Sequence, residues 1–131
     1  MLTLNEKSLQ DKESWESSGF ILPRFDRSTV QERTLNSPQW VHFGAGNIFR
    51  AFIADINQQL LNDELMDTGI IVADGYDEEI IDVAYAPYDN LCVNVVLKSD
   101  GNIDKEVLAG VIESLKMDAS GFSRLKDIFY N

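Results

Sequence analysis

A glycine-rich turn between two apolar segments constrains the fold of this chain more than any other feature. The turn has the sequence Gly44-Ala45-Gly46-Asn47-Ile48-Phe49-Arg50, and it follows the short apolar run at residues 40–43 and opens a long amphipathic segment. In a strand–turn–helix arrangement, such glycines let the backbone turn tightly and approach a phosphate, which the free N–H groups at the helix start then bind. The turn therefore predicts an anion site, and a dinucleotide is the first ligand to consider.

A second apolar run, residues 69–73, predicts the next strand of a βαβ unit and ends at Asp74. An acidic residue at this place holds the ribose hydroxyls in dinucleotide-binding folds, and Asp77 is the rival for that role. An acid here favours NAD over NADP, because it repels a 2′-phosphate. The third glycine of the full fingerprint is replaced by Phe49, so the glycine motif alone is not specific.

The predicted cofactor-binding residues lie on the turn and at the end of the second strand: Gly44, Ala45, Gly46, Asn47, Ile48, Arg50 and Asp74. Arg50 has an alternative role, a surface ion pair with Asp55. His42 lies inside the first strand, where we expect a packed side chain rather than a catalytic base. The acidic run 77–79 is predicted to be a solvated helix start rather than a cation site, so we expect no metal.

Charge and composition exclude several classes of partner. The chain has 131 residues, which is the size of one domain, and its formal net charge is −11. Nucleic acids and anionic membranes need a basic face, so neither is expected as a partner. Cys92 is the only cysteine, and we expect it to be a buried small hydrophobe in a reducing compartment. With no apolar stretch of about 20 residues and no basic signal segment, a cytoplasmic location is predicted.

The remaining pattern predicts a partial Rossmann-like α/β domain, a doubly wound parallel sheet with an added hairpin, over residues 40–131. Residues 1–39 are expected to be a polar lead-in, with a short helix at residues 8–15 and no central strand at residues 22–27. Helical spacing predicts a crossover helix over residues 48–66. Its core stripe would consist of Phe49, Phe52, Ile53, Ile56 and Leu60.

The last third of the chain contains further strand and turn signals. The β-branched run 91–97 predicts a strand, and residues 99–102 predict a hairpin turn. Residues 103–115 fit both a strand and a helix, and we expect a strand that yields to helical structure. Ser120 is expected to cap a last helix that carries Phe122, Leu125 and Phe129.

Residues 40–52 resemble the N-terminal signature of the mannitol dehydrogenase family, which includes long-chain polyol dehydrogenases and hexuronate reductases. Residues 22–27, 88–91 and 97–101 resemble further segments of that family. Ile48, Phe49 and Phe52 replace an aromatic residue and two histidines of the signature, and this departure points to the fructuronate reductase (mannonate oxidoreductase) branch. The residues that match the signature are His42, Gly44, Gly46, Asn47, Arg50 and Ala51.

The resemblance implies an NAD-dependent oxidoreductase that transfers a hydride between nicotinamide and a keto sugar acid or polyol, without a metal. It also implies that a lysine in a second, helical domain performs the acid–base chemistry. On this basis we expect the chain to hold only the N-terminal part of the nucleotide domain, with the catalytic helical domain absent and no activity alone. Two alternatives stay open: a non-catalytic nucleotide-binding or interaction module from a truncated gene, and a flavodoxin-like α/β domain that binds a phosphate.

Overall fold

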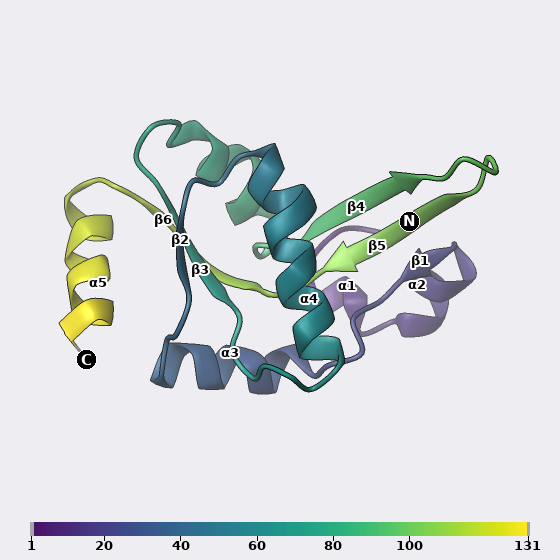
Figure 1. Ribbon diagram of the computed structural model, residues 1–131, viewed down its shortest axis with the longest axis horizontal. Coiled ribbons are helices and arrows are strands. Elements are labelled where there is room, and N and C mark those ends of the chain that lie inside the picture. The colour runs from purple at the N-terminus through teal and green to yellow at the C-terminus, as the bar shows by residue number, and fades with distance from the viewer. Residues whose placement is uncertain (1, 131) are drawn as a thin grey trace.

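Two three-stranded sheets form the frame of the fold (Figure 1). A computed structural model describes residues 2–130. The first sheet is wholly parallel, in the order β2-β3-β6, and is made of Val41–Phe43, Ile70–Asp74 and Val111–Lys116. The second sheet is mixed, in the order β1-β5-β4, and is made of Phe20–Ile21, Ile103–Leu108 and Cys92–Leu97. The chain is therefore an α/β protein with the predicted parallel sheet and hairpin.

Strand β3 is the centre of the parallel sheet. All of its residues, Ile70–Asp74, are buried, as expected of a continuous apolar run that is covered on both faces. It pairs with β2 in a register that places Val41 opposite Ile71, and this confirms the prediction that the two apolar runs are neighbouring parallel strands. Because parallel strands end at the same edge, the glycine turn after β2 lies beside the acidic end of β3.

The crossover helix forms where it is predicted, but it begins with a π turn. The π turn spans Phe49–Ile53, and α4 follows over Ala54–Asn62. A π turn contains an extra residue, so it rotates the following helix face relative to a regular 3.6-residue period. The predicted stripe is therefore wrong in part, since Phe52 and Ile56 are 65% and 56% exposed. The residues that face the core are Phe49, Ala54, Asn57, Gln58 and Leu61.

A buried glutamine joins α4 to the second sheet. Gln58 Nε2 donates to Val107 O at 2.7 Å, and Ala109 N donates to Gln58 Oε1 at 2.9 Å. Both polar atoms of the amide are therefore satisfied, which is the condition for burying a polar side chain without a large penalty. This pairing explains why a residue that the helical pattern places away from the core lies fully inside it.

The predicted hairpin is confirmed, but the helix expected after it is not formed. Strands β4 and β5 pair antiparallel, and β6 then continues the chain into the parallel sheet beside β3. Apolar residues at helical spacing also fit two short strands with a break between them, and the break lies at Ala109 and Gly110. A Cβ on Gly110 would lie 2.1 Å from Asn57 Oδ1, so glycine allows α4 to approach closely there.

The N-terminal segment contains more structure than its polar composition predicts. The expected helix at residues 8–15 is present as two short helices, α1 (Glu6–Leu9) and α2 (Lys12–Ser17). A third helix, α3 (Arg27–Asn36), is not predicted, because it has few apolar residues and buries only Val30 and Thr34. Strand β1 pairs in parallel with β5, so this segment adds a strand to the second sheet.

Arg27 ties the N-terminal segment to the sheets. Its Nε donates to Ala109 O at 3.1 Å, and its Nη2 donates to Val111 O at 3.0 Å and to Asp89 O at 2.7 Å. Nη1 forms an ion pair with Glu6 of α1. The Arg27 side chain, which is 12% exposed, therefore binds the backbone at the β5–β6 junction and a side chain of the first helix.

The last helix, α5 (Ala119–Tyr130), forms as predicted, with a different cap and a different buried face. Asp118 binds the helix start in place of Ser120, since Gly121 N donates to Asp118 Oδ1 at 2.9 Å. Phe122 and Phe129 are exposed, and the helix buries Gly121, Leu125 and Ile128. In Figure 1, α5 lies at the opposite end of the molecule from the β4–β5 hairpin. No helix among residues 2–130 is long and apolar enough to cross a membrane.

A pair of carboxylates between α4 and β5 predicts a pH-dependent stability. Gln59 Nε2 donates to Asp55 Oδ1 at 3.3 Å and to Glu106 Oε1 at 3.4 Å, which brings the two acids together. The pKa of Glu106 is raised to about 7. Burial is the largest cause, and the nearby Asp55 carboxylate is the next. A raised carboxyl pKa means that stability is lost as the pH rises from about 4.5 through 7.

We therefore expect Glu106→Gln to be more stable than the wild type at pH 8 and nearly equal to it at pH 4.5. Urea unfolding at the two pH values measures the difference. Glu79→Gln, which removes an exposed charge, is the matched control and should show little change between the two pH values. An equal difference for Glu106→Gln at both pH values would show that the pKa of Glu106 is not raised in the folded protein.

Candidate functional site

The glycine turn connects the end of β2 to the π turn of the crossover helix, and its two glycines serve different purposes. Gly44 has φ +109°, a conformation that side chains rarely adopt, and its N–H donates to Ala73 O at 2.7 Å. Gly46 has no such constraint, and a Cβ built on it would meet no atom within 4 Å. Gly44 therefore shapes the turn, and Gly46 leaves open space above it.

The peptide groups of Ala45 are held on both sides by buried hydrogen bonds. Ala45 N donates to Asp74 Oδ2 at 2.8 Å, and Tyr85 Oη donates to Ala45 O at 2.8 Å. Ala45 itself is fully buried. These bonds fix the turn to the end of β3 and to the π helix Ile81–Tyr85.

His42 packs under the turn, as predicted for a strand histidine. Its ring stacks on Phe49 with 4.4 Å between the centroids, and its Nδ1 lies 3.0 Å from Gly44 O. The histidine therefore supports the turn from within the fold.

Asp74 binds three backbone N–H groups at the end of β3. Besides Ala45 N, its carboxylate accepts from Tyr76 N at 2.9 Å and from Asp77 N at 2.8 Å, and the residue is 7% exposed. Burial raises the pKa of Asp74, but the three N–H donors outweigh burial and lower it below the usual range. Asp74 is thus an ionised acid beside the turn, and the exposed Asp77 lies next to it.

The lowered pKa of Asp74 predicts that this acid stabilises the fold only while it is ionised. A depressed carboxyl pKa contributes stability above about 3.8, the ordinary value, and that contribution is lost as the pH falls below it. Asp74→Asn should lower the free energy of unfolding by about 2 kcal/mol at pH 7 and by much less at pH 3. Urea unfolding measures both, with Asp77→Asn as the exposed control. A difference that persists at pH 3 would contradict the assignment.

Backbone N–H groups at the start of the crossover helix are free to bind a ligand. The N–H groups of Gly46, Asn47 and Ile48 donate to no residue in the described part of the chain, whereas Arg50 N donates to Gly46 O at 3.1 Å. Both Asn47 and Ile48 are exposed. Free donors at a helix start, beside the open space at Gly46, suit an anion.

Arg50 adds an unneutralised positive charge close to the turn. Its guanidinium lies 5.7 Å from the centroid of the Tyr85 ring, and its Nη1 lies 3.5 Å from Asn47 Oδ1. Within residues 2–130 it forms no ion pair, so the alternative pairing with Asp55 is not observed, and its buried Nε has no partner. Burial raises the pKa of the nearby Cys92 thiol despite the opposing effect of Arg50, so that cysteine stays neutral.

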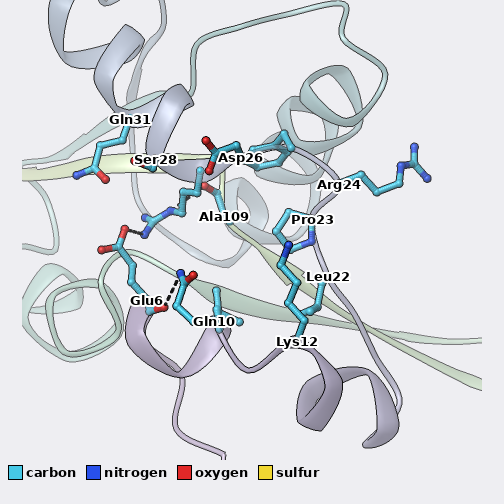
Figure 2. Close-up of a pocket in the computed structure, with 13 residues that line it drawn as sticks. Glu6, Gln10, Lys12, Leu22, Pro23, Arg24, Asp26, Ser28, Gln31 and Ala109 are labelled. Atoms are coloured by element: carbon cyan, nitrogen blue, oxygen red, sulfur yellow. Dashed lines mark hydrogen bonds and ion pairs between the residues drawn. The ribbon is translucent and has the colours of Figure 1, made fainter.

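A cavity of about 650 Å³ lies away from the turn, between α1 and the segment that precedes α3 (Figure 2). Glu6 and Gln10 line one side, and the side chain of Arg24 points outward. The Arg27 guanidinium in its lining is already bound by its own partners. None of the predicted cofactor-binding residues lines this cavity, and residues 2–130 contain no cluster of His, Cys, Asp and Glu suited to a metal ion.

The parallel sheet with a glycine turn at its edge defines an α/β fold of the kind found in polyol dehydrogenases. The structure is similar to that of Pseudomonas fluorescens mannitol 2-dehydrogenase, solved as a ternary complex with NAD and D-mannitol. The TM-score is 0.72 at 20% identity, over 95% of this chain and 24% of that one. It is also similar to a D-sorbitol dehydrogenase in substrate-free form. There the TM-score is 0.68 at 23% identity, over 87% of this chain and 23% of that one.

Over nearly its whole length the chain is similar to proteins of the mannitol dehydrogenase family, and it matches about a quarter of the length of each. It is 45% identical to the D-mannonate oxidoreductase of Thermotoga maritima (strain ATCC 43589 / DSM 3109 / JCM 10099 / NBRC 100826 / MSB8) over 132 aligned residues. That alignment covers 99% of this chain and 24% of the relative, so the chain spans about a quarter of the relative's length. No family model matches the chain.

Proposed function

We propose that this chain forms the N-terminal part of the nucleotide-binding domain of an NAD-dependent oxidoreductase. The observation that carries the proposal is the group of free N–H donors at Gly46, Asn47 and Ile48, next to the unpaired charge of Arg50. Open space lies beside Gly46, because a Cβ built on it would meet no atom within 4 Å. A pyrophosphate carries the charge and the acceptor oxygens that such a site lacks.

The acidic end of β3 supports NAD rather than NADP. Asp74 is ionised because three N–H groups hold it, and Asp77 adds a second carboxylate at the same edge. A ribose diol can donate to a carboxylate, whereas a 2′-phosphate would meet like charge. We assign the ribose to Asp74, with Asp77 as the alternative. The proposed cofactor-binding set is Gly44, Ala45, Gly46, Asn47, Ile48, Arg50 and Asp74.

The proposed reaction interconverts a keto sugar acid and its alcohol, of the fructuronate–mannonate type. The support is the 45% identity to a D-mannonate oxidoreductase. When bound, the nicotinamide supplies or accepts the hydride, and the residues of this chain bind and orient the nucleotide. The partner is then a small sugar acid or polyol. Neither a nucleic acid nor a membrane is proposed, because the net charge is −11.

The binding proposal is tested by calorimetric titration of the chain with NADH and with NADPH. NADH is expected to bind more tightly, and ADP-ribose should compete with it because it shares the pyrophosphate and the adenosine. Asp77→Asn is the control for the ribose assignment and should leave the affinity for NADH nearly unchanged. Tighter binding of NADPH would show that the ribose is placed wrongly, and no binding of either would reject the site.

The 131-residue chain is expected to show no turnover of fructuronate, tagaturonate or mannitol with the nicotinamide cofactor. It aligns with only 24% of the relative, and we assign no proton-transfer residue within it. General acid–base groups contribute about 10²–10⁴-fold to such rates, and substrate positioning contributes further. Nicotinamide absorbance measures the rate. Turnover by the purified chain would show that the chemistry lies within these residues.

A further inference from the structure

We propose that Tyr85 is a positioning residue of the glycine turn, and that its hydroxyl sets the direction of the Gly46 N–H toward the bound anion. The inference deepens the proposed function and rests on it for its ligand. Tyr85 lies 40 residues beyond Ala45 in sequence, outside the glycine motif, and it reaches the turn only through the fold.

The planarity of the peptide bond carries the argument. The carbonyl of Ala45 and the N–H of Gly46 belong to one peptide unit, and in a trans peptide they point in opposite directions. Residues 2–130 contain no cis peptide. Tyr85 Oη holds the Ala45 carbonyl toward the interior at 2.8 Å. The N–H of Gly46 must therefore point away from the Tyr85 hydroxyl, and Gly46 itself is exposed.

The preceding peptide unit, between Gly44 and Ala45, has the opposite orientation, with its N–H rather than its carbonyl pointing inward. The Ala45 N–H points inward to Asp74 Oδ2, so the Gly44 carbonyl of the same unit points away from Asp74 and lies 3.0 Å from His42 Nδ1. Asp74 and Tyr85 thus hold two consecutive peptide units from two separate elements. This leaves the turn little freedom to lose when an anion binds, which favours binding.

The environment of Tyr85 suits a permanent donor. The residue is 2% exposed, and burial raises the pKa of its phenol far above the ordinary value, although Arg50 opposes that shift. The hydroxyl therefore stays protonated and donates to Ala45 O throughout the range in which the protein is folded. A carbonyl that accepts a hydrogen bond also polarises its own peptide unit, which strengthens the opposite N–H as a donor.

The test removes only the hydroxyl, in Tyr85→Phe. The matched control is Tyr88→Phe, because Tyr88 lies in the same region, is 40% exposed, and its hydroxyl bonds to no described residue. Calorimetry should show NADH binding weakened about 3- to 10-fold in Tyr85→Phe, the effect of one lost hydrogen bond, and unchanged in Tyr88→Phe. The amide NMR signal of Gly46, recorded without nucleotide, should move in Tyr85→Phe and stay in place in the control.

The two measurements separate the inference from the proposed function. If the wild-type chain does not bind NADH, the proposed function fails, and the Gly46 amide signal alone decides the role of Tyr85. An unmoved Gly46 signal, or an unchanged NADH affinity in a wild type that binds, would overturn the role of Tyr85. If Tyr85→Phe does not fold, 3-fluorotyrosine at position 85 keeps the ring and strengthens the donor. The Gly46 signal should then move, and its failure to move would also overturn the inference.

Discussion

Gly46→Val is expected to leave the fold intact and to weaken NADH binding by at least about 100-fold. The new side chain enters open space in the protein, since a Cβ there meets no atom within 4 Å and the backbone is outside the left-handed region. The same side chain fills the space above the free N–H groups, so a pyrophosphate loses several charge-assisted hydrogen bonds together. Calorimetry with NADH measures the loss, and circular dichroism and urea unfolding monitor the fold.

Gly44→Ala is the matched control for this prediction, because it changes the other glycine of the turn. The φ of +109° at Gly44 makes any side chain strained, so this variant should lose about 1–2 kcal/mol of stability. The two substitutions are therefore expected to have different effects. Gly46→Val should weaken binding alone, whereas Gly44→Ala should lower the stability of the fold. Normal NADH binding by a folded Gly46→Val variant would show that the pyrophosphate does not lie over the turn.

Arg27→Ala is expected to lower the free energy of unfolding by about 3 kcal/mol, the largest effect on stability that we predict. The substitution removes the donor from the carbonyls of Ala109, Val111 and Asp89 at once. Ala109 and Val111 are buried, whereas Asp89 is exposed. A buried carbonyl that loses its donor costs about 1–3 kcal/mol, and water entering the space left by the side chain offsets part of the sum. The ion pair with Glu6, which fastens α1, is lost as well. Urea unfolding measures the change.

Arg24→Ala provides the comparison, because Arg24 also forms an ion pair but does so at the surface. Its side chain is 67% exposed and lies 3.2 Å from Asp63. Exposed pairs of this kind contribute about 0–1 kcal/mol, so the variant should remain close to the wild type. Equal effects of the two arginine substitutions would mean that the backbone contacts of Arg27 add no stability.

The centre of the parallel sheet could be predicted from the sequence because local pattern and tertiary role agree there. The run 70–73 is apolar throughout, and burial on both faces is the environment that such a run requires. The turn is likewise predictable from residue type, since the positive φ at Gly44 favours glycine and the missing side chain at Gly46 leaves open space. Periodicity and turn chemistry are local, and they suffice for these elements.

Other features depend on contacts between distant residues, and the sequence does not reveal them. The π turn rotates the face of α4, so the helical period gave the wrong buried residues at Phe52 and Ile56. Tyr85 has no sequence signal as a partner of Ala45, because the contact spans 40 residues. Helix α3 escaped prediction because it is anchored largely by polar contacts of Arg27, which hydrophobic periodicity cannot detect.

Gln58 and Arg27 together supply hydrogen-bond partners for the backbone where the chain passes from one sheet to the other. Between β5 and β6 the backbone leaves its neighbouring strands while still buried, and its peptide groups need other partners. Gln58 binds Val107 O and Ala109 N, and Arg27 binds Ala109 O and Val111 O, so two side chains replace the missing strand. The β4–β5 hairpin can thus be regarded as an insertion with two fixed anchors. Transferring it to another parallel sheet would require moving both side chains with it.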